Sequence, residues 1–266
     1  MFLSEIKEAL SATAATRANN AATFAIVAES DDFIVVEKPA FLLIHPSKPT
    51  NARTLWGELR HLLAFELANG GQVSIVNRLD RETSGLVLVA KNAATARRFG
   101  LAMQEQRIAK EYLAIVWGWP EWESKTVDAP LLRQGIHAPS KIWLKQTIHP
   151  AGAPARTQFT IERRFTRDGA GNDRFSVIRA IPETGRTHQI RVHLSSLGHP
   201  VVGDKIYGPD EGLYLEFIET GWTPALESRL LLPRHALHSA ALKIDAGETW
   251  TSPLPADLRT FAGDVP

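Results

Sequence analysis

Short apolar runs separated by turn-forming residues constrain the fold of this chain most strongly. Phe33–Val36, Val73–Val76 and Leu86–Ala90 are each flanked by polar residues or glycine. Apolar runs of this length are typical of buried strands. Further segments rich in strand-forming residues predict strands over 112–117, 157–165 and 175–181, the last two joined by a tip at 168–173, and a hairpin over 238–250.

Helical signals are fewer and do not alternate with the strands. Helices are predicted over Thr54–Leu67, after the N-cap residue Asn92 to about Glu105, and over Arg186–Leu197. A short helix is also compatible with Ile6 and Leu10. This order favours an α+β domain over a doubly wound parallel sheet. We expect residues 1–32 to form an N-terminal extension and residues 33–266 the domain.

Composition excludes several classes of protein. The 266 residues contain 30 Lys and Arg against 29 Asp and Glu, a net charge of +1, so a polybasic coat for nucleic acid is not expected, although a local basic cleft is compatible with this balance. The absence of cysteine excludes disulfides, thiolate nucleophiles and cysteine metal sites. Without a membrane-length apolar run or a secretory signal, the chain is expected to be a cytoplasmic monomer.

Cofactor and metal motifs are also missing from the sequence. It contains no phosphate-binding P-loop, no dinucleotide-binding glycine pattern after a strand and no nucleophile elbow. His188 and His193 are five residues apart and cannot share a metal from one helix face, and the pair His235 and His238 lacks a third ligand. We expect neither a cofactor nor a metal.

Two polar segments concentrate the chemically versatile side chains. Asn77–Leu86 lies between two predicted strands, and Glu183–His193 lies at the start of a predicted helix, where free N–H groups favour anions. Each segment taken alone is explained more simply as a surface turn with ion pairs or as a solvated helix face.

Together with four other segments in order, these two closely resemble the RluA-type family of RNA pseudouridine synthases. The similarity covers roughly residues 33–255, and its matching stretches are Val35–Ala40, Asn77–Leu86, Ala109–Ala114, Gly185–His193, Gly198–Gly208 and Ala236–Ala240. It implies an α+β fold with a central, mostly antiparallel mixed sheet, flanking helices and an RNA-binding cleft. Ribosomal or transfer RNA is the implied partner.

The resemblance also implies roles for individual residues. Asp80 matches the catalytic aspartate, Tyr112 the tyrosine that stacks on the target base, and Arg186 the arginine that pairs with the catalytic carboxylate. Arg78 matches an arginine associated with base flipping. The residues expected to contact RNA are Arg78, Arg81, Thr187, His188, Gln189 and Arg191.

Two positions depart from the family pattern. Asn77 replaces the usual histidine before Arg-Leu-Asp, which predicts different local packing. Phe41 replaces the glycine that often follows Lys-Pro-x, so this loop is predicted to avoid a turn with positive φ.

Two other classes of protein compete with an active synthase. A catalytically silent RNA-binding or chaperone module on the same fold would not need Asp80, Tyr112 and Arg186 together. A hydrolase of glycosidic bonds would also use a carboxylate near C1′. The product distinguishes the three: pseudouridine, no product, or free uracil.

Overall fold

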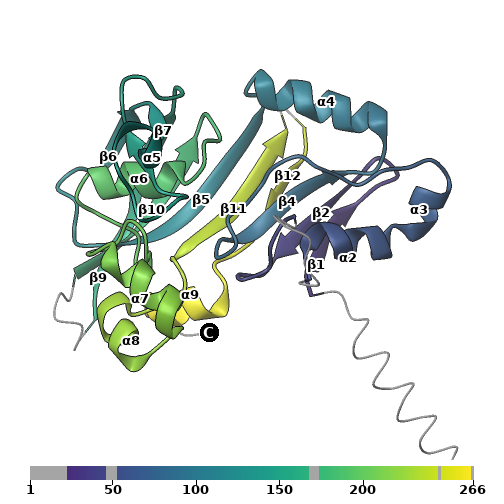
Figure 1. Cartoon of the computed structure of the whole chain (residues 1–266). Coiled ribbons are helices and arrows are strands. Elements are labelled where there is room, and N and C mark those ends of the chain that lie inside the picture. Colours follow the sequence, from purple (N-terminus) through teal and green to yellow (C-terminus); the bar gives the residue numbers. More distant parts are fainter. Residues whose placement is uncertain (1–22, 46–52, 168–173, 245–246, 265–266) are drawn as a thin grey trace, which may run out of the picture.

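One large mixed sheet organises the computed structural model, which describes residues 23–45, 53–167, 174–244 and 247–264 (Figure 1). The strands follow the order β1-β2-β4-β11-β5-β10-β9-β6, with β3 beside β4 and β12 beside β11. Every pair in this sheet is antiparallel except β11 with β4. The strands are β1 Ala25–Glu29, β2 Phe33–Lys38, β3 Ser74–Ile75, β4 Ser84–Ala90, β5 Ile108–Trp117, β6 Ser124–Asp128, β9 Arg156–Thr166, β10 Arg174–Pro182, β11 Leu237–Ile244 and β12 Thr249–Thr251. The predicted α+β fold with a mostly antiparallel mixed sheet is confirmed.

The predicted strands all form, and one strand lies where an extension was expected. β1 pairs with β2 at the edge of the sheet, so residues 25–29 belong to the sheet and not to a separate N-terminal segment. The segment after β6 folds back on itself as a small two-stranded sheet, β7 Leu131–Arg133 with β8 Gln146–Ile148. The predicted tip at 168–173 and the helix near Ile6 lie outside the described residues.

The helices are arranged around the large sheet, as Figure 1 shows. Asn92 caps its helix with its side chain, as expected. Thr54, predicted as the first residue of a helix, is instead the N-cap of a helix that is interrupted at Leu63. The predicted third helix begins three residues late because His188 adopts φ 56°. The helices are α2 Leu55–Leu62, α3 Ala64–Ala68, α4 Ala93–Gln104, α5 Gln134–His137, α6 Gln189–Ser196, α7 Gly212–Thr220, α8 Pro224–Leu230 and α9 Ala256–Phe261.

Both faces of the central strands are buried, which fixes the position of the loop before β4. Along β4, Val87 and Val89 belong to one hydrophobic cluster, whereas Leu86 and Leu88 belong to another. Gly85 permits the close parallel contact with β11, because a Cβ there would lie 2.2 Å from the carbonyl oxygen of Ser239. The loop before β4 is therefore held against the middle of the sheet.

The prediction for Phe41 is wrong. Its φ is 69°, so the turn keeps the left-handed backbone although the residue is not glycine. The carbonyl of Leu42 accepts a hydrogen bond from the ammonium of Lys38 at 3.0 Å, and that of Phe41 accepts one from Arg81 at 3.4 Å. These tertiary contacts hold the turn against its local steric preference.

Candidate active site

Asp80 lies in the loop between β3 and β4, and buried cations fix the backbone that follows it. Lys38 donates to the carbonyl of Arg81 at 3.2 Å, and Arg234 donates to the carbonyl of Glu82 at 3.3 Å. The side chain of Asp80 keeps 30% of its surface exposed. The carboxylate is therefore held in place and remains accessible to a substrate.

The hydrogen bonds of Asn77 show what asparagine does at this position, where the family usually has histidine. Its amide nitrogen donates to the carbonyl of Leu86 at 3.0 Å, and its amide oxygen accepts from the N–H of Leu88 at 2.8 Å. Asn77 thus ties the start of the loop to β4 through two backbone groups. Its contacts are structural, and its side chain is buried.

Arg191 is the arginine that pairs with Asp80. Its Nη1 donates to Oδ2 of Asp80 at 2.9 Å, while Nε and Nη2 donate to the two carboxylate oxygens of Asp204 at 2.6 and 2.8 Å. Arg191 is 4% exposed and Asp204 is completely buried. The planar guanidinium is therefore oriented by a bidentate pair and presents its remaining edge to Asp80.

The predicted pairing of Arg186 with Asp80 is wrong, and Arg191, which was predicted to contact RNA, forms that pair instead. Arg186 precedes α6, is exposed, and donates from Nε to the carbonyl of Pro154 at 3.0 Å. The left-handed residue His188 ends the turn that carries Arg186 before the helix begins. Arg191, inside the helix on its buried side, reaches the carboxylate instead.

His188 also lies close to the carboxylate of Asp80. Its Nε2 lies 3.9 Å from Oδ2 of Asp80, and its Nδ1 shares a hydrogen bond of 2.8 Å with the hydroxyl of Tyr207. That hydroxyl also accepts from the backbone N–H of Gln146 at 2.8 Å, which links the site to β8. The ring is nearly buried, so it positions neighbouring groups and presents little surface to RNA.

The surroundings of Asp80 favour its ionised form. Burial by itself would raise the pKa of this carboxyl, but the positive potential of His188 and Arg191 and the hydrogen bond from Arg191 lower it below its ordinary value. Because burial lowers the pKa of His188 to about 4, Arg191 supplies the positive charge at neutral pH. The site thus holds a carboxylate ready to act as nucleophile or base.

Tyr112 lies on β5 close to this carboxylate. It is 8% exposed, and burial together with the charge of Asp80 raises the pKa of its phenol, which stays protonated. Its phenol also interacts with the side chain of Ser239, whose hydroxyl donates to the carbonyl of Leu86 at 3.3 Å. These bonds orient the ring beside Asp80, where the predicted stacking residue is expected.

The other predicted RNA contacts divide into two groups. Arg78, Arg81 and Thr187 are exposed. Gln189 is buried: its amide oxygen accepts from the hydroxyl of Thr184 and the N–H of Arg186, and its amide nitrogen donates within the protein. Gln189 therefore holds the turn before α6 through hydrogen bonds inside the protein.

Sequence analysis missed residues that complete the site. Asp204 orients Arg191, Tyr207 holds His188, and Lys38 fixes the loop after Asp80. Asp204 and Tyr207 lie in the matching stretch Gly198–Gly208 and Lys38 lies in Val35–Ala40, but the resemblance alone gave these three residues no role. A signal was available for Asp204, because it is the sole carboxylate of that segment.

Buried histidines predict a loss of stability in acid. Burial lowers the pKa of His188 and of His238 to about 4 and that of His235 well below its ordinary value. Below pH 6.5, the ordinary pKa of histidine, these side chains bind protons in the unfolded chain but stay neutral in the folded protein. The free energy of unfolding therefore decreases as the pH falls from about 6.5 to about 4. Each histidine contributes up to about 1.4 kcal/mol per pH unit in this window.

Denaturant titrations at successive pH values measure this dependence. His188→Asn, which tolerates the left-handed backbone, should reduce the slope by about one proton. His61→Asn on the exposed side of α2 should leave it unchanged. A free energy of unfolding that is constant across the window would contradict this explanation.

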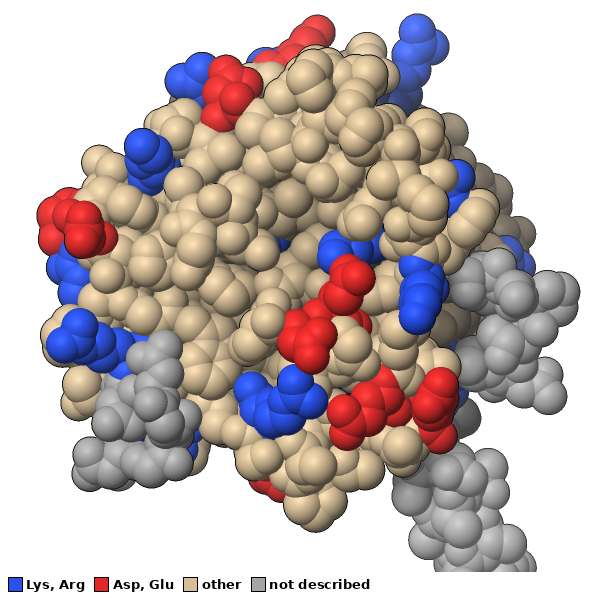
Figure 2. Space-filling view, turned by 60° about the vertical axis from the view of Figure 1, so that its left-hand side comes forward, with Lys and Arg blue, Asp and Glu red and all other residues tan. Residues whose placement is uncertain are grey.

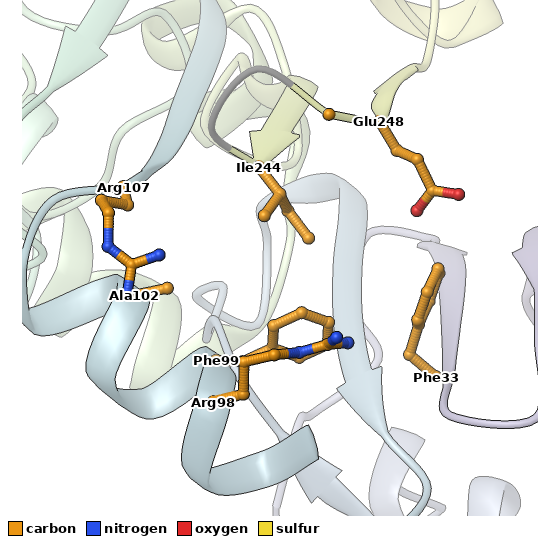
Figure 3. Close-up of a pocket in the computed structure, with 8 residues that line it drawn as sticks. Phe33, Arg98, Phe99, Ala102, Arg107, Ile244 and Glu248 are labelled. Atoms are coloured by element: carbon orange, nitrogen blue, oxygen red, sulfur yellow. The ribbon is translucent and has the colours of Figure 1, made fainter. Parts of the chain in front are cut away.

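A pocket elsewhere in the structure does not belong to this site. It lies against α4, and its lining includes the apolar residues Phe33, Phe99, Ala102 and Ile244 and the charged residues Arg98 and Glu248 (Figure 3). The apolar lining belongs to the cluster of Leu86, on the opposite face of β4 from the cluster that contains Tyr112. Within the described ranges, no group of three or more metal-binding side chains occurs and no helix is long and apolar enough to cross a membrane.

Comparison with known proteins identifies the family. The sequence profile described as RNA pseudouridylate synthase matches residues 32–196. The ribosomal large subunit pseudouridine synthase D of Nitrosomonas europaea is 35% identical over 88% of this chain, which spans 62% of that protein's length. The protein of the same name from Haemophilus ducreyi is 34% identical over 88% of this chain and 68% of its own.

Solved structures agree with this assignment. Human RNA pseudouridylate synthase domain containing 1 superposes with a TM-score of 0.64 at 28% identity, over 87% of this chain and 83% of that one. Human RNA pseudouridylate synthase domain containing 4 superposes with a TM-score of 0.66 over 96% and 95%, and at 20% identity it shows the common fold alone. The chain belongs to the RNA pseudouridylate synthase family, as its RluA-type motifs predict.

Proposed function

We propose that this protein isomerises uridine to pseudouridine in ribosomal or transfer RNA, with Asp80 as the catalytic carboxylate. The observation that carries the proposal is an ionised, partly exposed aspartate oriented by a buried Arg191–Asp204 pair. The names of the relatives favour ribosomal RNA of the large subunit as the substrate.

The reaction needs only groups that this site contains. The N1–C1′ bond of uridine breaks, the uracil turns over, C5 bonds to C1′, and the proton of C5 is lost while N1 gains one. Oxidation state does not change, so no electron carrier is required. A carboxylate beside C1′ acts as nucleophile or as base in this sequence, and Arg191 holds it ionised and oriented.

The target nucleotide has to leave its base stack to reach Asp80, at a cost of a few kcal/mol. Arg78 is exposed two residues before Asp80, and we expect its planar guanidinium to fill the vacated stack. Tyr112 offers its ring to the extruded uracil, and stacking of this kind is worth roughly 1–3 kcal/mol per base. Together these residues offset the cost of extrusion.

Substitution of Tyr112 tests the stacking role. Tyr112→Phe keeps the ring face and should retain most activity, whereas Tyr112→Ala removes it and should lose activity by roughly ten- to hundredfold. The serine partner in Tyr112→Phe keeps its bond to the carbonyl of Leu86. Tritium release from C5-labelled uridine measures activity at equal folded fraction. Equal losses in both variants would mean that the hydroxyl, and not the ring, carries the main role.

The direct test is to identify the product in RNA. Ribosomal and transfer RNA from a deletion strain and its parent are derivatised for pseudouridine and analysed by mass spectrometry. A pseudouridine missing from the deletion strain and restored by the gene supports the proposal and locates the uridine. Release of free uracil by the purified protein would indicate a hydrolase, and RNA binding without either product would indicate a silent binding module.

A further inference from the structure

Lys110 is a buried lysine beside Tyr112 that the chemistry at Asp80 does not use. It lies on β5 two residues before Tyr112, so the two side chains leave the strand on the same face. The residue is 6% exposed. Burial lowers the pKa of its amino group, and no carboxylate offsets that effect.

Lys110 differs from the other buried lysines of the described residues in having no partner. Lys38 donates to three backbone carbonyls, Lys91 pairs with two glutamates, and Lys205 pairs with a glutamate and a carbonyl. No hydrogen bond or ion pair is formed by Lys110 within the described ranges. An ammonium in this position lowers stability unless a ligand compensates it.

The ammonium opens onto the turn that precedes α6. A Cβ added to Gly185 would lie 3.7 Å from Nζ of Lys110, so the absence of a side chain at Gly185 leaves room beside the charge. Nζ is not among the fully buried atoms that lack a partner, so it still touches solvent. Gly185, Arg186 and Thr187 are all exposed. The site is therefore a cationic recess beside the turn that precedes α6.

The position of Lys110 relative to Asp80 indicates which part of a nucleotide it meets. The charge of Asp80 affects the pKa values of Tyr112 and Lys38, but not that of Lys110. The ammonium of Lys110 lies instead beside Gly185, in the turn before α6. The phosphate of a nucleotide lies away from C1′ and carries a full negative charge, which suits a compact ammonium.

We propose that Lys110 binds a backbone phosphate of the RNA substrate in the recess beside Gly185–Thr187. The proposal rests on the proposed function in that the ligand is RNA. On the face shown in Figure 2, Lys and Arg side chains are interspersed with Asp and Glu and do not form one basic patch. Because the net charge of the chain is only +1, binding of RNA depends on individual cations near the site, and Lys110 is expected to contribute measurably to it.

Lys110→Met separates binding from packing because methionine has nearly the same shape without the charge. The probe is a fluorescently labelled oligouridylate of about twelve nucleotides, titrated over a series of salt concentrations. We expect affinity at low salt to fall roughly tenfold and the slope of log K against log salt to become shallower by about 0.7. The melting temperature should stay equal or rise, because an unpaired buried charge has been removed.

Two controls make the outcome decisive. Lys125→Met removes an exposed lysine of the edge strand β6 and should change neither the slope nor the melting temperature. An oligouridylate with a neutral methylphosphonate backbone should bind the parent and Lys110→Met equally. A difference that persists on the neutral backbone would assign Lys110 to the base and overturn the phosphate site.

Other results would also overturn the proposal. Unchanged affinity and slope in Lys110→Met would exclude a phosphate contact, and a lower melting temperature with unchanged binding would indicate a structural role. Formation of pseudouridine in ribosomal RNA by the parent is measured separately. Failure of the phosphate site is thereby distinguished from failure of the proposed function.

Discussion

Asp80→Asn should form no detectable pseudouridine while folding and binding RNA about as well as the parent. A neutral amide of nearly the same shape serves neither as carboxylate nucleophile nor as base. Arg191 keeps Asp204 as its bidentate partner in this variant, so the substitution leaves no unpaired cation in the interior. We therefore expect the free energy of unfolding to change by about 1 kcal/mol or less.

Tritium release and RNA binding, with circular dichroism as the folding check, measure these outcomes. Asp31→Asn, an exposed aspartate in the turn between β1 and β2, is the matched control and should keep parental activity. Glu82 is unsuitable as a control although it lies two residues from Asp80, because its carboxylate pairs with the buried Lys205 at 2.8 Å. Substantial tritium release by folded Asp80→Asn would exclude Asp80 as the catalytic carboxylate.

Arg191→Gln should cost both stability and activity, whereas Arg186→Gln should affect stability little. Removing the guanidinium leaves the fully buried Asp204 without its partner, and breaking such a pair costs roughly 3–5 kcal/mol. Loss of the charge beside Asp80 should lower kcat/KM by about a hundredfold. Arg186 is exposed, and its replacement should change the free energy of unfolding by about 0.5 kcal/mol at most.

Activity and stability can be separated with a second variant. Arg191→Gln combined with Asp204→Asn removes both buried charges, so it should recover much of the lost stability and still be inactive. Denaturant titration and tritium release give the two readouts. If Arg186→Gln is inactive while Arg191→Gln is folded and active, then Arg186 and not Arg191 is the functional partner of Asp80, as the sequence predicted.

Local sequence patterns correctly predicted those elements of the fold that depend on residues close together in the chain. Apolar runs predicted β2 and β4 because a strand buried on both faces needs consecutive apolar residues. Asn92 was identified as a helix cap because its side chain bonds the N–H of Thr95, three residues later. Motif similarity predicted the family, and the placement of Asp80 and Tyr112 close together agrees with it.

Contacts between distant segments decided the electrostatics of the site. Asp80 and Arg191 are separated by 111 residues, and which of two arginines reaches the carboxylate depends on where the turn before α6 ends. A single left-handed residue, His188, sets that point, and neither helix propensity nor motif spacing reveals it. The tertiary structure also held Phe41 in a turn that its side chain disfavours.

The sequence by itself thus determined the family, the strands of the sheet and the position of the candidate carboxylate. Only the tertiary structure decided that Arg191 and Asp204 orient that carboxylate and that Lys110 is left without a partner. The physical reason is that apolar burial and capping are properties of a short stretch of chain. The pairing of buried charges depends instead on which side chains the whole fold brings within hydrogen-bonding distance.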